Sequence, residues 1–259
     1  MQSVNVRSCL FAFAFTVALT AAQDPFAGVW KLNQSKSKFT GEIVKYEKKP
    51  SGAMLVSSGG IEYEFKIDGS EYPLPFGGTT SWKQENDRTW VSVYKLKGKE
   101  LSTTRGALSA DGRTRTTTTT GTKPNGEAFT EVVTYQRVAG GPGLSGAWKS
   151  TEVKISSPGT FQITAPGPNA LTFSSSEYQF LCKAQLDGKD YPVTGPTVPE
   201  GFTMSVKRIG PRQTEYLQKN KGKPIYEGVM MVSPDGRTLT EDSWPVGMKQ
   251  EKVTAVYEK

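Results

Sequence analysis

The chain has 259 residues, with 32 basic side chains, 25 acidic ones and no histidine, which gives a formal net charge of +7. The absence of histidine excludes histidine-based catalytic triads and dyads and the commonest zinc-ligand sets. The lysines are dispersed, with no arginine cluster and no nucleic-acid motif. The charge therefore predicts a moderately basic soluble surface and no nucleic-acid partner; the alternative is weak attraction to an anionic envelope surface.

Residues 1–22 have the pattern of a secretory signal peptide. Arg7 supplies a positive start, residues 10–19 form an apolar run, and Thr20-Ala21-Ala22 ends it with small side chains. The run is too short to span a bilayer comfortably, which favours cleavage before Gln23 over a membrane anchor. No later segment is apolar enough to cross a membrane as a helix. We therefore expect an exported bacterial protein, periplasmic or secreted.

Several short segments then recur in one order, at offsets of 118 to 124 residues. The clearest pairs are Gly28-Val29-Trp30-Lys31 with Gly146-Ala147-Trp148-Lys149, Asp68-Gly69 with Asp187-Gly188, and Asp111-Gly112-Arg113-Thr114 with Asp235-Gly236-Arg237-Thr238. The chain is therefore two copies of one module of roughly 115 residues. We expect domains over 24–138 and 146–259, held close together by the short linker 139–145.

Both copies are rich in β-strand signals. Residues 61–67 alternate apolar and charged, and residues 89–97 are rich in β-branched and aromatic side chains. The Asp-Gly pairs, together with Asn125-Gly126, predict hairpin turns. No window of 12 residues has helical periodicity. The expected fold is all-β: two tandem antiparallel up-and-down barrels of about eight to ten strands each, since closure removes unpaired edges.

Two segments could suggest a binding or catalytic function, but each is better explained as an ordinary β-strand. A threonine ladder over 116–120 would suit ice or sugar binding, but the second copy has Thr240-Glu241-Asp242-Ser243-Trp244 there. The adjacent Glu241 and Asp242 point to opposite faces of a strand, so they are poor partners for two-carboxylate catalysis. We expect no catalytic residue, no metal site and no cofactor.

The Gly-x-Trp at the start of each copy resembles the lipocalin signature. The Trp-Lys-Leu-Asn start at 30–33, the turn at 187–193 and the Val-Tyr-Glu-Lys end at 256–259 resemble small exported bacterial proteins described as lipocalin-like. The resemblance covers nearly all of 24–259. The resemblance implies lipocalin/calycin-like barrels. In lipocalins the tryptophan closes the base of the barrel, and a basic residue near the end of the domain packs across its ring. Arg137 and Lys259 stand at suitable positions for that cation–π contact. The chain departs from typical lipocalins in lacking a disulfide and a clear C-terminal helix, and its copies are shorter.

The copies differ on their inward strand faces. In the first copy the inward sets are Ile61, Tyr63, Phe65, Ile67 and Trp90, Ser92, Tyr94, Leu96; the equivalent sets in the second are Phe180, Cys182, Ala184, Leu186 and Thr214, Tyr216, Gln218, Asn220. Large apolar side chains mostly give way to smaller or more polar ones, although Tyr216 replaces a serine. We expect aromatic rings to plug the first barrel and a cavity to remain in the second. The alternative is two solid barrels.

The candidate ligand-binding residues are those of the second barrel: Phe180, Cys182, Ala184, Thr214, Tyr216, Gln218 and Asn220. Cys182 is the single cysteine after residue 22, and an inward thiol is typical of an inert small hydrophobe rather than a reactive group. The favoured function is binding of a small, partly apolar or amphipathic molecule. The alternatives are a cell-envelope structural or interaction protein without a ligand and, third, an enzyme.

Overall fold

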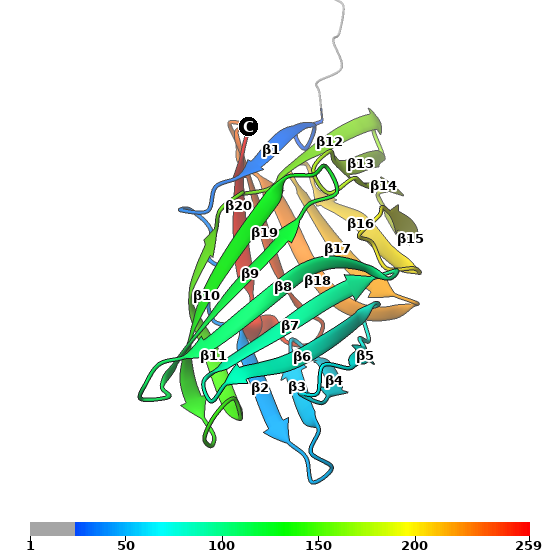
Figure 1. The fold of residues 1–259 in the computed structure, drawn as a ribbon. Helices are drawn as coiled ribbons and strands as arrows, with labels where there is room; N and C mark the ends of the chain where they lie inside the picture. The colour runs from blue at the N-terminus through cyan, green and yellow to red at the C-terminus, as the bar shows by residue number, and fades with distance from the viewer. Residues whose placement is uncertain (1–23) are drawn as a thin grey trace, which may run out of the picture.

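The computed structural model describes residues 24–259, and the expected signal peptide over 1–22 lies outside them (Figure 1). The described chain consists of twenty β-strands and one short 3-10 helix, η1 (Lys249–Glu251). None of its helices is long and apolar enough to cross a membrane. The prediction of an all-β fold with two antiparallel barrels of about eight to ten strands each is confirmed: each barrel has ten strands, and one is closed while the other is nearly closed.

The first barrel, called barrel 1, is a continuous meander. Its order in the sheet is β4-β3-β2-β11-β10-β9-β8-β7-β6-β5, so it is nearly closed, with no strand pairing between β4 and β5. Its strands are β2 (Ile43–Lys48), β3 (Met54–Ser58), β4 (Ile61–Phe65), β5 (Glu71–Pro73), β6 (Thr79–Asn86), β7 (Thr89–Leu96), β8 (Lys99–Leu108), β9 (Thr114–Thr122), β10 (Ala128–Ala139) and β11 (Gly146–Ile155). The threonine run lies in β9 as an ordinary ladder strand between β8 and β10.

The second barrel, called barrel 2, is fully closed and contains the chain's first strand. Its strands are β1 (Gly28–Leu32), β12 (Thr160–Gly167), β13 (Ala170–Ser175), β14 (Phe180–Gln185), β15 (Asp187–Thr194), β16 (Phe202–Gly210), β17 (Gln213–Asn220), β18 (Lys223–Val232), β19 (Thr238–Pro245) and β20 (Val253–Glu258). In Figure 1 the C-terminus lies beside β1, at the far end of the molecule from the β2–β3 hairpin.

The two copies exchange their first strands. β1 pairs with β12 and β20, whereas β11, the first strand of the second copy, pairs with β10 and β2. The barrels therefore do not coincide with the expected domains 24–138 and 146–259. Barrel 1 is continuous over 43–155, and barrel 2 combines 24–32 with 160–259. The expected linker 139–145 is instead the turn of a hairpin between β10 and β11, which carries β11 into barrel 1.

The repeated glycine turns have a structural cause. Gly69, Gly112, Gly188 and Gly236 all have positive φ, between 66° and 81°. In the first and third turns a tyrosine hydroxyl donates to the aspartate four residues earlier: Tyr72 Oη to Asp68 Oδ2 at 2.8 Å and Tyr191 Oη to Asp187 Oδ2 at 3.1 Å. The Asp-Gly-x-x-Tyr motif thus stabilises a turn, which accounts for its presence in both copies.

The predicted cation–π contacts are present, with partners from different copies. Arg137 lies 4.0 Å from the ring of Trp148, and the Lys259 ammonium lies 4.6 Å from the ring of Trp30. Each indole also donates to the carbonyl four residues earlier, at Leu144 and Phe26. The strand exchange causes the crossed pairing, because each tryptophan stands on an exchanged strand.

Aromatic rings and one arginine fill the interior of barrel 1. Phe65 stacks on Trp82 with 4.4 Å between ring centroids. Arg115 is buried, and its guanidinium lies 4.9 Å from the Tyr46 ring and 4.5 Å from the Tyr135 ring. This packing agrees with the predicted aromatic plug, apart from the arginine, which the sequence did not indicate as an inward residue.

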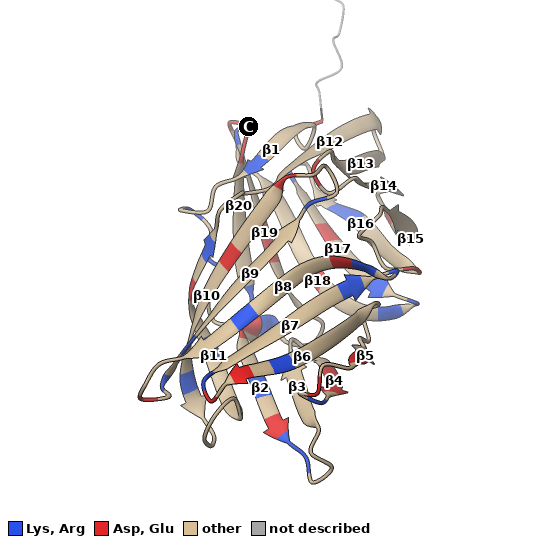
Figure 2. Ribbon diagram, viewed as in Figure 1, with Lys and Arg blue, Asp and Glu red and all other residues tan. Residues whose placement is uncertain are grey.

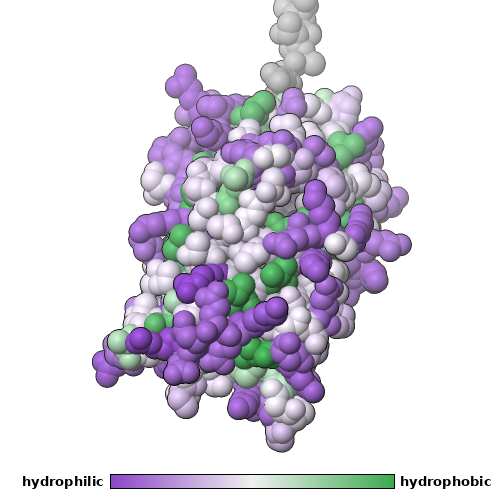
Figure 3. All heavy atoms as spheres, viewed as in Figure 1, coloured by the Kyte–Doolittle hydropathy of each residue, from purple (hydrophilic) through white to green (hydrophobic). Residues whose placement is uncertain are grey.

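Most charged side chains lie on the outer surface of both barrels, with Arg115 and Lys123 as buried exceptions. Figure 2 shows the two signs interspersed along the strands, and Figure 3 shows apolar residues as separate small patches among hydrophilic ones on the same face. Exposed strand positions such as Lys83, Lys154 and Glu152 therefore mark the outward faces, as the alternation predicts.

Candidate ligand-binding cavity

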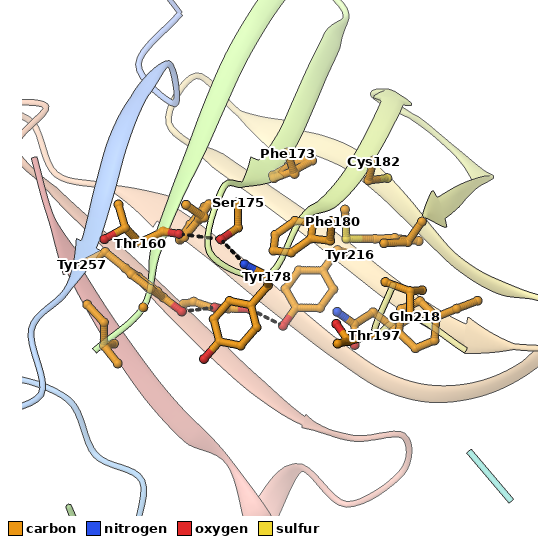
Figure 4. Close-up of a pocket in the computed structure, with 18 of the residues that line it drawn as sticks. Thr160, Phe173, Ser175, Tyr178, Phe180, Cys182, Thr197, Tyr216, Gln218 and Tyr257 are labelled. Carbon is orange, nitrogen blue, oxygen red and sulfur yellow. Dashed lines mark hydrogen bonds between the residues drawn. The ribbon is translucent and has the colours of Figure 1, made fainter. Parts of the chain in front are cut away.

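Barrel 2 encloses a cavity of about 610 Å³ that opens beside barrel 1 (Figure 4). Most of its wall comes from strands of barrel 2, and Phe129, Glu131 and Ile155 of barrel 1 contribute at one end. Eight aromatic side chains line it: Phe129, Phe161, Phe173, Tyr178, Phe180, Phe202, Tyr216 and Tyr257. The cavity is therefore mainly apolar, and its polar side chains are those of Glu131, Ser157, Thr160, Ser175, Thr197, Gln218 and Glu241 besides the tyrosine hydroxyls.

Four of the seven predicted residues line this cavity. Phe180 and Cys182 stand on β14, and Tyr216 and Gln218 stand on β17. Figure 4 shows Tyr216 on the strand that crosses behind the cavity, with Gln218 further along it. Of the two rings that barrel 1 has at Tyr63 and Phe65, the one replaced by Cys182 is missing from the cavity wall, whereas Ala184 lies outside the wall.

The other three predicted residues lie outside the cavity wall. Ala184 is buried in the core of barrel 2, and Thr214 is fully buried at the start of β17. Asn220, at the other end of that strand, donates from Nδ2 to the carbonyl of Pro75 in barrel 1 at 3.2 Å. All three are buried, as the alternation predicts, but the cavity lies toward one end of barrel 2, where it is lined by Thr160 at the start of β12, Ser175 at the end of β13 and Phe180 at the start of β14.

A carboxylate with two tyrosine partners forms the polar centre of the cavity. Tyr216 Oη donates to Glu241 Oε1 at 2.6 Å, and Tyr257 Oη donates to Glu241 Oε2 at 3.1 Å. Burial, reinforced by the Glu241 charge, raises the pKa of both tyrosines well above the ordinary value, so both hydroxyls stay protonated at neutral pH. Glu241 thus lines the cavity, although it is not among the residues predicted from the sequence.

A glycine makes the geometry of this centre possible. Gly228 stands opposite Tyr216 in the ladder between β17 and β18. A Cβ at position 228 would lie 2.7 Å from Tyr216 Oη and 2.6 Å from the Asp242 carbonyl oxygen. The absence of a side chain therefore lets the Tyr216 ring lie across β18 and reach Glu241 on β19.

Asp242 points the other way from its neighbour. It accepts from Lys252 Nζ at 2.9 Å and from Thr254 Oγ1 at 2.6 Å on the outer face of β20. The interpretation that the two adjacent carboxylates occupy opposite faces is therefore confirmed. Within residues 24–259, no group of three or more Cys, Asp or Glu side chains is placed to hold a metal ion.

Cys182 is 1% exposed, and burial raises the pKa of its thiol to about 11. The thiol is therefore protonated at neutral pH and weakly nucleophilic. This agrees with the interpretation of Cys182 as a small hydrophobic side chain, here in the wall of a cavity.

An ion cluster around the buried Lys123 ammonium lies at one side of the cavity rim. The Lys123 ammonium lies 2.7 Å from Glu177 Oε2 and 3.2 Å from Glu127 Oε2, and it packs 5.5 Å from the Tyr178 ring. At the same rim, burial and the nearby Glu42 charge raise the pKa of Glu131. Lys123 and Glu127 belong to barrel 1 and Glu177 to barrel 2, so the cluster joins the barrels where the cavity opens.

Comparisons with known proteins do not assign the chain to a family. No protein-family model matches the chain, and no curated protein is significantly similar to it. Among solved structures, the di-domain ARO/CYC StfQ from the steffimycin biosynthetic pathway shares 9% identity, with 85% of this chain and 76% of that chain covered, at a TM-score of 0.14. A TM-score this low gives no structural correspondence from which to argue.

Proposed function

We propose that this protein is an exported, lipocalin-like binding protein that holds a small, partly apolar molecule in barrel 2. The observation that carries the proposal is the cavity of about 610 Å³, whose largely aromatic wall includes a small number of polar side chains, with Glu241 and its two tyrosine partners among them. Small-ligand sites typically measure about 300–1,000 Å³ and combine apolar walls with a few placed polar groups. The leader-like pattern of residues 1–22 supports export to the periplasm or the exterior.

Two features favour binding over catalysis. The thiol of Cys182 has a pKa raised to about 11 by burial, and the tyrosines are likewise held protonated. The Glu241 carboxylate accepts a hydrogen bond on each oxygen, and its neighbour Asp242 faces outward.

Ser157, which also lines the cavity, accepts from Lys123 Nζ at 2.7 Å and donates to the Glu127 carboxylate. Although burial opposes the charge, hydrogen bonds to Glu177 and Glu127 raise the pKa of Lys123, so this amine is held as an ammonium rather than as a free base.

Uptake of a neutral fluorescent probe tests the proposal. N-phenyl-1-naphthylamine becomes bright in an apolar cavity, so its fluorescence is titrated with protein spanning residues 23–259. The variant Cys182→Tyr restores the ring that barrel 1 has at Tyr63, and Leu181→Tyr adds the same ring on the neighbouring, more exposed position. We expect saturable uptake at one probe per chain, weakened at least about ten-fold by Cys182→Tyr and preserved in Leu181→Tyr.

Either of two results would contradict the proposal. One is the absence of saturable fluorescence with the unaltered protein. The other is an equal affinity in the Cys182→Tyr variant, which would place the probe elsewhere on the molecule.

A further inference from the structure

The charged groups of the cavity wall all have the same sign. Glu131 and Glu241 line it, and the described wall contains no lysine or arginine, although the chain has 32 basic residues. Lys123, beside the rim, is already paired with Glu177 and Glu127. The cavity is thus acidic within a protein that is basic overall, which a purely apolar ligand does not require.

From this contrast we infer that barrel 2 selects a lipophilic cation, an organic molecule with an apolar body and a protonated amine, and that Glu241 receives the amine. The inference rests on the proposed function, because it names the chemical class of the ligand. It also assigns separate roles to the two parts of the site: the aromatic walls hold the body, and the carboxylate holds the charge.

Glu241 has spare capacity to accept a ligand donor. Its two oxygens accept one hydrogen bond each from Tyr216 and Tyr257, whereas a carboxylate offers about four acceptor positions. Both tyrosines are neutral donors, and in residues 24–259 no basic side chain forms a salt bridge with Glu241. Glu241 is half-buried in an aromatic-lined cavity, so a cationic ligand would supply the counter-charge that the protein does not.

The walls suit a cation as well as an apolar body. Figure 4 shows the rings of Phe180, Tyr216 and Tyr257 in the same part of the cavity as the hydrogen bonds to the carboxylate. The faces of aromatic rings attract cations, and the attraction grows when the site excludes water. An anionic ligand would instead meet Glu241 at the polar centre and Glu131 at the rim.

Three ligands with one naphthalene body isolate the effect of charge. They are 1-naphthylmethylammonium, 1-naphthalenemethanol and 1-naphthoate, each titrated calorimetrically into the full mature chain at pH 7. We expect the ammonium to bind at least about ten-fold more tightly than the alcohol and the carboxylate to bind most weakly, since the charge–charge interaction is strengthened by burial.

Matched variants locate the charge preference. Glu241→Gln keeps the size of the side chain but removes its charge; we expect it to abolish the preference for the ammonium over the alcohol. Asp242→Asn removes one charge from the next residue, on the outer face, and is expected to retain the preference. Thermal unfolding of each variant checks that the barrel is intact.

The outcomes separate the inference from the function on which it rests. Equal binding of all three ligands, or an ammonium preference that persists in a folded Glu241→Gln variant, would overturn the inference while leaving a binding protein. Failure of all three to bind would count against the proposed function itself. If Glu241→Gln does not fold, the three-ligand comparison on the unaltered chain still decides whether the cavity prefers a cation.

Discussion

At the scale of single residues, equivalent positions in the two copies have taken different roles. Tyr63 in barrel 1 corresponds to Cys182 in the wall of the barrel 2 cavity. The alternation of apolar and polar side chains predicted the strand faces on which these residues lie. It did not reveal Arg115 or Glu241, because a charged residue at an inward position looks like one more surface position in the sequence. Their partners, Tyr46, Tyr135, Tyr216 and Tyr257, come from other strands of the same barrel.

The reactivity of Cys182 is a residue-scale test of the cavity wall. Because burial raises the thiol pKa to about 11, only about one thiol in a thousand is ionised at pH 8. We expect slow alkylation by iodoacetamide, with a rate that rises about ten-fold per pH unit from pH 8 to pH 10. Mass spectrometry follows the modification, and bound N-phenyl-1-naphthylamine should slow it further. A rate that levels off near pH 9 would show that the thiol is not buried as described.

At the scale of elements, the sequence predicts strands, turns and the number of barrels, but not the barrel to which an exchanged strand belongs. Gly28–Leu32 and the start of Gly146–Ile155 carry the same Gly-x-Trp-Lys pattern, so either strand fits either barrel. The connections decide the choice. The turn over 140–145 holds β11 against β10, while residues 33–42 run from barrel 2 to barrel 1, with Lys38 bridged to Thr254 and Gly41 bonded to Ser150.

Cross-strand disulfides distinguish the two possible arrangements. Val29 stands opposite Gln162 in the exchanged structure. Without exchange Val29 would stand opposite Lys45, since its counterpart Ala147 does so in barrel 1. Opposed residues have Cα atoms about 4.5–5.5 Å apart, within the range that a disulfide spans. We expect Val29→Cys with Gln162→Cys to form an intrachain disulfide in the monomer, seen by non-reducing peptide mapping. Oxidation of the Val29→Cys, Lys45→Cys pair instead would refute the exchange.

At the scale of the whole molecule, the exchange makes the two barrels depend on each other. In the sequence, all the strands of barrel 1 come between β1 and β12, which pair with each other in barrel 2. The ion cluster around Lys123 forms a second connection between the two barrels, at the cavity rim. Phe129, Glu131 and Ile155 of the plugged barrel complete the cavity of the open one. One barrel is thus filled by side chains, and the other has a cavity whose wall includes residues of both barrels. Sequence comparison predicted which barrel is hollow but not that both contribute to its wall.

Native mass spectrometry of the protein purified from its own host tests the central claim most directly, because it detects a bound ligand of any identity by its mass. We predict a population of chains carrying one additional small mass, absent from the Cys182→Tyr variant and retained in Leu181→Tyr. A bare chain mass, with no uptake from a mixed lipid and metabolite extract, would contradict the claim and favour a ligand-free role in the cell envelope.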